Sequence, residues 1–229
     1  EIQAAILDGT YKDGERLPSE RTLCEQYNVS RITVRQALNE LDKTGLVFSS
    51  QGKGTFVKMP IVSQGLLKVV SFAKSLEQTG KTGRTEIHSF DHEVVAKNVE
   101  EIIYGSAGGR LCHLGLLGIA DNEPIVYYSS YIRKEIGEKM RDSAVRMEEE
   151  KLAFTTYDLY GEVGLQIERI DQQIKAINSS PEVSGLLGIK TGDALLVLRS
   201  LVYAGGTLTE YKMGYYRADK YTFTITREL

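Results

Sequence analysis

The sequence predicts an α+β chain in two parts, and three observations lead to this prediction. Residues 1–58 carry short helical patterns that end in two β-forming segments around a polar loop. Residues 69–229 alternate strand patterns with a few helices on one side of what we expect to be a mostly antiparallel sheet. Between them, residues 59–68 show no clear period and hold a proline and a glycine, which predicts a linker.

The first element is a helical pattern carried by Ile2, Ala5 and Ile6, which stops at Asp8-Gly9. Turn-forming residues follow. The next helix starts in "LPSE", because Ser19 can cap free backbone amides and an acidic residue after it favours the positive end of the helix dipole. This helix is expected to run to about Tyr27.

A second helix follows after a tight turn at Asn28. Ser30 is its expected cap, and the helix reaches Lys43 before Gly45 stops it. Two short helices joined by a few residues form a helix-turn-helix. Apolar residues recur at helical spacing along the second helix and predict its buried side: Val34, Ala37, Leu38 and Leu41.

A β-hairpin completes the first part. The β-forming pairs 47–48 and 56–57 flank the polar segment 49–54, which contains two glycines and is expected to be the hairpin tip. Helices followed by such a hairpin make a winged helix-turn-helix.

Two arginines stand out on the second helix. With the apolar side turned to the core, Arg31, Arg35 and, to one side, Thr33 face outward, where a recognition helix meets the major groove. Arginine suits bidentate contacts to guanine or a phosphate, and the capped end at Ser30 offers amides to a phosphate. The alternative is a solvated arginine pair. The cap, the arginine face and the glycine-lysine tip lie within thirty residues, and this combination favours DNA binding.

Composition limits the remaining possibilities. The 229 residues are 41% hydrophobic and 26% charged, with a net charge of -3, so any nucleic-acid site must be local. Residues 30–58 hold five basic and two acidic side chains. We expect a cytoplasmic protein without a membrane span, since no apolar run is long enough and no secretory signal opens the chain. Cys24 and Cys112 are expected to be packed thiols, with no metal site.

The stretch "LPSERTLCEQYNVSRITVRQALNELDKTGLVFSSQGKGTFV" resembles the winged-helix domain of GntR-type bacterial transcription regulators. One departure is Ile32, where a second hydroxyl residue is often found. The resemblance implies a set of DNA-contacting residues in the helices and the wing: Arg21, Ser30, Arg31, Thr33, Arg35, Gln51, Gly52 and Lys53.

The second part is predicted element by element from its patterns. Strands are expected over 85–95 and 166–177, two more around the turn 120–124, and a closing meander over 193–225 whose hairpin turn is Gly205-Gly206. Helical patterns cover 97–105, 151–163 and 180–189.

This order resembles the UTRA effector domain of the HutC branch of the GntR family, a fold similar to chorismate lyase. The signs are "ADNEPIVYYSSYI" and "LTEYKMGYYRADKYTF". The resemblance implies an effector pocket between sheet and helices, often for a phosphosugar or a related metabolite. It places Glu210 and Tyr216 in that pocket, together with Thr155 and Tyr157 at the start of a helix.

Other pocket positions depart from the family. Members that bind phosphorylated sugars usually show Arg-Leu-Arg where this chain has Leu116-Leu117-Gly118, and Tyr128 stands where an acid is expected. Losing two guanidinium groups removes the bidentate donors that a phosphate prefers. Arg84, next to Thr85, is a candidate replacement cation. We expect a less anionic or more aromatic ligand, with tyrosines as possible walls: Tyr127, Tyr128, Tyr131 and Tyr157.

These expectations describe a transcription regulator that binds double-stranded operator DNA as a homodimer and responds to a small-molecule effector. The sequence shows no nucleophile with a base and no phosphate loop, and it implies no cofactor. Two alternatives stay open: an enzyme of chorismate-lyase-like fold, and a DNA-binding protein without an effector. Fold similarity alone does not transfer activity.

Overall fold

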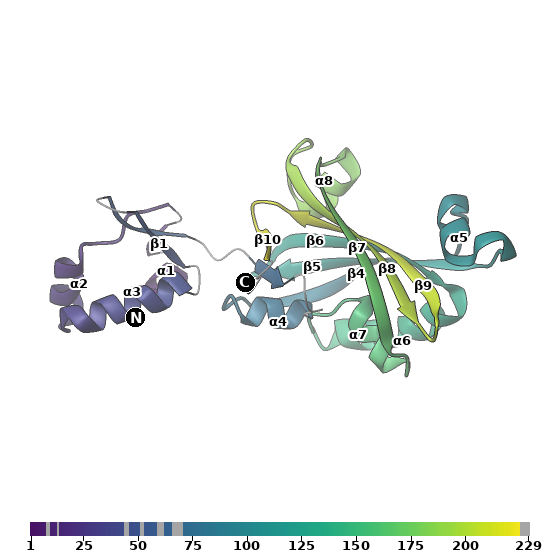
Figure 1. Ribbon diagram of the computed structural model, residues 1–229, viewed down its shortest axis with the longest axis horizontal. Coiled ribbons are helices and arrows are strands. Elements are labelled where there is room, and N and C mark those ends of the chain that lie inside the picture. The colour runs from purple at the N-terminus through teal and green to yellow at the C-terminus, as the bar shows by residue number, and fades with distance from the viewer. Residues whose placement is uncertain are drawn as a thin grey trace, which may run out of the picture. The chain divides into compact units, whose positions relative to one another are not determined.

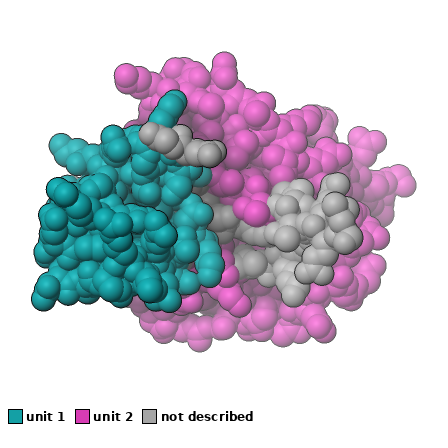
Figure 2. Space-filling view, turned by 60° about the vertical axis from the view of Figure 1, so that its left-hand side comes forward, with its two compact units in different colours: residues 1–61 teal, residues 62–229 magenta. Residues whose placement is uncertain are grey.

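The computed structural model describes residues 1–7, 10–12, 14–43, 46–50, 53–58, 62–65 and 71–224. The chain divides into two compact units, Glu1–Ile61 and Val62–Leu229, which Figure 2 shows in different colours. Each unit has its own buried core, as independently folding domains do.

The first unit is a three-helix structure with a hairpin, as the sequence predicts. Its elements are α1 (Ile2–Leu7), α2 (Glu20–Tyr27), α3 (Arg31–Lys43), β1 (Val47–Ser50) and β2 (Gly54–Val57). The two strands pair antiparallel, and Val47 and Val57 join the core together with Val34 and Leu41 of α3. Burial of the predicted apolar side fixes which face of α3 points outward.

Local capping explains where the first helices begin and end. The Ser19 hydroxyl accepts a hydrogen bond from the Thr22 amide at 3.2 Å, and the Ser30 hydroxyl accepts one from the Thr33 amide at 3.2 Å. Asn28 adopts the left-handed conformation, with φ 52°, and ends α2. The predicted caps and the tight turn are confirmed.

The second unit is built on one six-stranded antiparallel sheet, in the order β4-β5-β6-β9-β8-β7 (Figure 1). Because β6 pairs with β9, the two long hairpins β5-β6 and β8-β9 lie side by side in the middle. The strands are β4 (Gly83–Val94), β5 (Leu111–Ala120), β6 (Glu123–Arg133), β7 (Ile167–Asn178), β8 (Ala194–Ala204) and β9 (Thr207–Arg217). The predicted mostly antiparallel sheet is confirmed.

Two short strands lie outside this sheet and correct the prediction. β10 (Tyr221–Thr224) leaves the meander and pairs in parallel with β3 (Val62–Gly65). The range predicted as an irregular linker, 59–68, therefore contains a strand of the second unit. Residues 59–61 and 66–68 of that range lie outside the described residues. The pairing joins positions far apart in sequence, so no local pattern signals it.

Helices cover both faces of the sheet, not one as predicted. On one face, α4 (Phe72–Glu77), α6 (Lys134–Glu149) and α7 (Thr156–Glu162) enclose the large core. On the other face, α8 (Pro181–Leu187) packs Val183 and Leu187 against Leu195 and Val197 of β8. Such two-sided burial follows from strands that present apolar residues alternately to both faces. α5 (Lys97–Tyr104) precedes β5.

Two helices of this unit differ from the sequence prediction. α6 has no counterpart among the predicted elements, although its buried Gly137, Met140 and Ala144 follow helical spacing. α7 begins at Thr156 and not at 151, because Thr155 and Asp158 form a capping box that starts the helix there. The preceding Lys151 has φ 56°, which is incompatible with a continuous helix.

We expect Gly137→Ala to destabilise the protein by about 1 to 3 kcal/mol, although alanine is the better helix former. A Cβ atom at this position of α6 would lie 1.9 Å from the Cys112 sulfur of β5. Chemical denaturation followed by circular dichroism measures the change. Cys112→Ala in the same chain should restore most of the lost stability, whereas Gly185→Ala on α8, where a Cβ meets nothing within 4 Å, should not reduce it.

Candidate functional site

The first turn of α3 presents a polar, solvent-exposed surface. Ser30, Arg31 and Thr33 are exposed, while Val34 turns into the core. The Ser30 and Thr33 hydroxyl groups lie 2.9 Å apart. Ile32 also stands in this surface with a relative exposure of 72%.

Arg35 is held in place by the neighbouring helix. Its Nε donates to both carboxylate oxygens of Glu20, at the start of α2, at 3.0 Å each. The hydrogen bond and the charge of Glu20 raise the pKa of Arg35. A guanidinium carries five N–H donors, so this contact uses the one on Nε and leaves those on the terminal nitrogens for other acceptors. From the sequence we read Glu20 only as a residue favourable to the helix dipole.

The remaining predicted DNA contacts lie on α2 and the hairpin. Arg21 is exposed and forms a 3.5 Å ion pair with Glu25 one turn further on. Lys53 is exposed directly before β2, whereas Gln51 and Gly52 lie outside the described residues. Surface ion pairs of this kind stabilise little and exchange readily for a phosphate.

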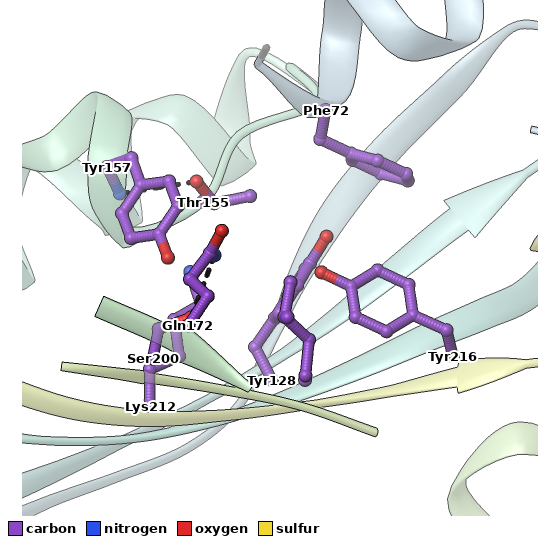
Figure 3. Close-up of a pocket in the computed structure, with 10 residues that line it drawn as sticks. Phe72, Tyr128, Thr155, Tyr157, Gln172, Ser200, Lys212 and Tyr216 are labelled. Carbon is purple, nitrogen blue, oxygen red and sulfur yellow. Dashed lines mark hydrogen bonds between the residues drawn. The ribbon is translucent and has the colours of Figure 1, made fainter. Parts of the chain in front are cut away.

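A small cavity lies in the second unit between the sheet and helices α4 and α7 (Figure 3). Its interior offers about 10 Å³ for the centres of water molecules, which is room for about one water. A larger ligand therefore requires the walls to move apart. The wall combines aromatic and polar side chains with a glycine: Phe72, Tyr128, Thr155, Tyr157, Gln172, Leu198, Ser200, Lys212, Gly214 and Tyr216.

Lys212 of β9 is the cation of this wall. The side chain is buried, and its Nζ donates to the Thr156 hydroxyl at 2.9 Å. Nζ also lies over the rings of Tyr128 and Tyr157, at 4.5 and 4.1 Å from the ring centres. Burial lowers the pKa of Lys212 to about 8, against the opposing charges of Glu210 and Asp158.

Glu210 lies two residues before Lys212 and is fully buried. Its Oε1 accepts a hydrogen bond from the Thr156 hydroxyl at 2.7 Å, so a single hydroxyl joins the ammonium to the carboxylate. Among the described residues, Glu210 Oε2 is a buried oxygen with no hydrogen-bond donor. A buried carboxylate oxygen without a donor is costly, which makes this oxygen a strong acceptor for any incoming group.

The tyrosines of the wall are neutral donors and acceptors at ordinary pH. Burial raises the pKa of Tyr128 and Tyr216 well above the usual value, and raises that of Tyr157 as well. Tyr128 and Tyr216 meet edge to face with ring centres 5.8 Å apart. Next to Tyr157, Gln172 donates to Ser200 at 3.0 Å. These groups can bind hydroxyl or carboxylate oxygens while their rings bind an apolar face.

Four of the predicted effector residues come together in this cavity: Tyr128, Thr155, Tyr157 and Tyr216. The predicted Glu210 adjoins the wall through Thr156. Arg84 instead pairs with Glu86 at 2.9 Å and donates to Asn122. Thr85 is buried and exchanges two hydrogen bonds with the backbone of Phe154. The structure does not bring Arg84 or Thr85 into the cavity wall.

The two other candidate wall tyrosines lie on the opposite face of the sheet. Tyr127 packs with the α8 cluster, and Tyr131 lies beside His113 with ring centres 4.9 Å apart. Neighbouring residues of a strand point to opposite faces, so Tyr127 and Tyr128 cannot both line one cavity.

Comparison with known proteins adds to this geometry. The family model described as "Bacterial regulatory proteins, gntR family" matches residues 1–57. The UTRA domain model matches residues 78–222, which is more than half of the chain. The chain belongs to the GntR family of bacterial regulatory proteins and carries a UTRA domain. The resemblance to the GntR family and to its UTRA domain is confirmed, and GntR-family membership identifies a transcription regulator and not an enzyme.

Relatives of this GntR regulator match along nearly the whole chain. The HTH-type transcriptional repressor NagR of Bacillus subtilis is 29% identical, covering 97% of this chain and 90% of the relative. The mannosyl-D-glycerate transport/metabolism system repressor MngR of Escherichia coli is 26% identical, over 98% and 91%. The crystal structure of PhnF from Mycobacterium smegmatis shares the fold, with a TM-score of 0.76, 23% identity and coverage of 99% and 97%.

The described residues contain neither a candidate membrane-spanning helix nor a candidate metal cluster. None of the described helices combines the length and apolar character of a bilayer span. No group of three or more histidine, cysteine or acidic side chains gathers as a metal site in that part of the chain.

Sequence reasoning about this GntR regulator missed several wall residues, above all Lys212. A usable signal was present. Glu210 and Tyr216 were both expected in the pocket and both lie on β9, where a period of two puts Lys212 and Gly214 on the same face as them. Phe72, Gln172 and Ser200 come from three other elements, and only the fold brings them to the cavity.

Proposed function

We propose that this regulator binds an operator with the exposed face of α3 and the wing, and that a small molecule in the cavity under α4 and α7 controls this binding. The proposed DNA contacts are Arg21, Ser30, Arg31, Thr33, Arg35, Lys53 and the wing positions Gln51 and Gly52. Three observations support these contacts. The arginines of α3 are exposed, Arg35 is hydrogen-bonded to Glu20, and Ser30 caps the start of α3.

Control by an effector is supported by a series of contacts that connects the cavity wall to β3. Tyr216 of the cavity wall packs against Tyr221 and Phe223 of β10, with ring centres 4.5 and 4.9 Å away, the first ring tilted and the second edge to face. β10 is hydrogen-bonded along β3, the first described strand after the DNA-binding unit. A ligand that moves Tyr216 would therefore also move β3, which follows the DNA-binding unit in the chain. Contacts of this kind can couple two sites energetically.

We further propose that the regulator acts as a homodimer. Two copies would place two α3 helices in successive major grooves about 34 Å apart, and the operator would then be an inverted repeat. Light scattering on the full chain checks the oligomeric state.

The test is release of DNA by candidate effectors. An operator is selected from random duplexes with the full chain, and its binding is followed by fluorescence anisotropy in the presence of sugar phosphates, amino sugars and small aromatic acids. We expect one chemical class to change the operator affinity by about tenfold, since coupling energies are typically 1 to 3 kcal/mol. Tight operator binding that no compound of any class changes would favour a DNA-binding protein with an unused cavity.

A further inference from the structure

Gly118 of β5 has no room for a side chain. A Cβ atom on Gly118 would lie 2.5 Å from Val126 and 3.0 Å from the Phe72 ring. Leu116, two positions earlier on the same strand, is fully buried in the apolar core. The Phe72 ring therefore lies close to Gly118, and this part of the described cavity wall holds no cation.

The cation of the cavity stands elsewhere, on β9. Lys212 is 3% exposed, yet it lines the cavity with its ammonium group between two aromatic rings (Figure 3). An ammonium has three donors, and Thr156 receives one of them. No carboxylate of the described residues forms an ion pair with Lys212 within 4.0 Å, since Glu210 is reached only through the Thr156 hydroxyl.

Burying an ammonium in this way is unfavourable unless something compensates for its charge. The hydration that a buried ion loses destabilises it by more than contacts with aromatic faces restore. A core position would be filled more stably by an apolar residue of similar volume. Glu210 and Asp158 offset part of the charge of Lys212, but among the described residues only one of its three donors is used, by Thr156. The other donors of this cavity-facing ammonium are suited to a ligand that brings acceptor oxygens.

We infer that the effector of this regulator is a small carboxylate whose negative group pairs with Lys212, on the side of the cavity opposite Phe72. This inference rests on the proposed function and names its ligand class. One ammonium, with Gln172 and Ser200 nearby, matches the single charge of a carboxylate. Among the described wall residues no second cation is present for a phosphate dianion. The rings of Tyr128 and Tyr157 fit a planar ligand body.

Carboxylate binding should depend on the charge of Lys212. The charged and titratable groups that face it are Glu210 on its own strand, Asp158 and Tyr157 on α7, and Tyr128 on β6. Because an anion favours the ammonium form, binding raises the pKa of Lys212, and affinity falls as pH rises through the pKa of the free protein, about 8.

The experiment uses the full chain with lysine labelled by ¹³C at Cε, without DNA. Nuclear magnetic resonance follows the Lys212 signal, assigned by its loss in Lys212→Met, from pH 6 to 10. Formate and benzoate are the carboxylate probes, inorganic phosphate is the phosphate probe, and benzyl alcohol is the neutral one. We expect benzoate or formate to raise the pKa of Lys212 by roughly one pH unit. Lys220, an exposed lysine paired with Glu123, should not respond.

Several results would overturn the inference. These are a Lys212 signal that no carboxylate changes, a larger response to phosphate, and equal binding of benzyl alcohol and benzoate. Lys212→Met should fold, because an apolar replacement of a buried charge is commonly neutral or stabilising, and should bind the carboxylate about tenfold more weakly. Since the measurement involves no DNA, a failure here leaves control by a neutral effector intact, and an absence of DNA release leaves the carboxylate site intact.

Discussion

Replacing Arg35 with alanine is expected to lower the affinity for the selected operator by about 1 to 3 kcal/mol, roughly fivefold to 150-fold. The affinity for random duplex DNA should fall much less. Glu20 binds Arg35 through Nε, so the guanidinium is held before DNA arrives, and its remaining donors suit a bidentate contact to a base edge. Fluorescence anisotropy with the operator and with a scrambled duplex of equal length measures both losses.

Lys43→Ala is the matched control for Arg35. Lys43 is an exposed cation at the far end of the same helix, paired with Glu40 at 3.1 Å. Its loss should change operator and random DNA affinities little and equally. If Arg35→Ala also weakened both duplexes by the same factor, Arg35 would be a phosphate contact without a role in sequence recognition.

Replacing Glu210 with alanine is expected to abolish the effector response while operator binding persists. Glu210 holds the Thr156 hydroxyl, which in turn receives Lys212, so its removal disorganises the polar side of the cavity. It also removes a charge that raises the pKa of Lys212. That pKa should therefore fall below about 8, and a larger share of Lys212 should be neutral at pH 7.5. Dose curves of DNA release measure the response.

Loss of a buried carboxylate can also reduce stability, by about 3 to 5 kcal/mol where a buried partner is left alone. Glu210→Gln separates the two effects, because glutamine can still accept from Thr156 but carries no charge. It should fold normally and show a weakened response. Glu123→Ala, an acid on the exposed end of β6, should leave the dose curve unchanged. An unaltered curve in both Glu210 variants would exclude Glu210 from effector control.

The features that sequence reasoning predicted well are those fixed by neighbours along the chain. Ser19, Asn28 and Ser30 set helix ends through contacts within three or four residues, and the predictions at these positions are confirmed. The hairpin 47–57 is equally local. Such features depend on capping and turn chemistry, which a short stretch of sequence contains in full.

The features that it missed depend on contacts between distant segments. The pairing of β3 with β10 joins residues about 160 positions apart, and it turns part of the expected linker into a strand. α8 likewise covers the face of the sheet on which β8 presents Leu195 and Val197, because α4, α6 and α7 cover the other face. The candidate cavity contains residues of both kinds. Strand alternation from Glu210 predicts that Lys212 lines it, whereas Phe72 reaches it only because α4 packs over the sheet.

The ion pair between Glu20 and Arg35 also bears on how the two arginines of α3 respond to salt. DNA binding releases the cations condensed on phosphates, and each neutralised phosphate adds to the salt dependence of the affinity. In the proposed DNA complex, Arg35 would arrive with the carboxylate of Glu20 beside it and would displace fewer of these ions than Arg31, for which the described residues show no ion pair. Loss of Arg31 should then reduce the salt dependence of DNA binding more than loss of Arg35, although the two side chains stand on adjacent turns of one helix.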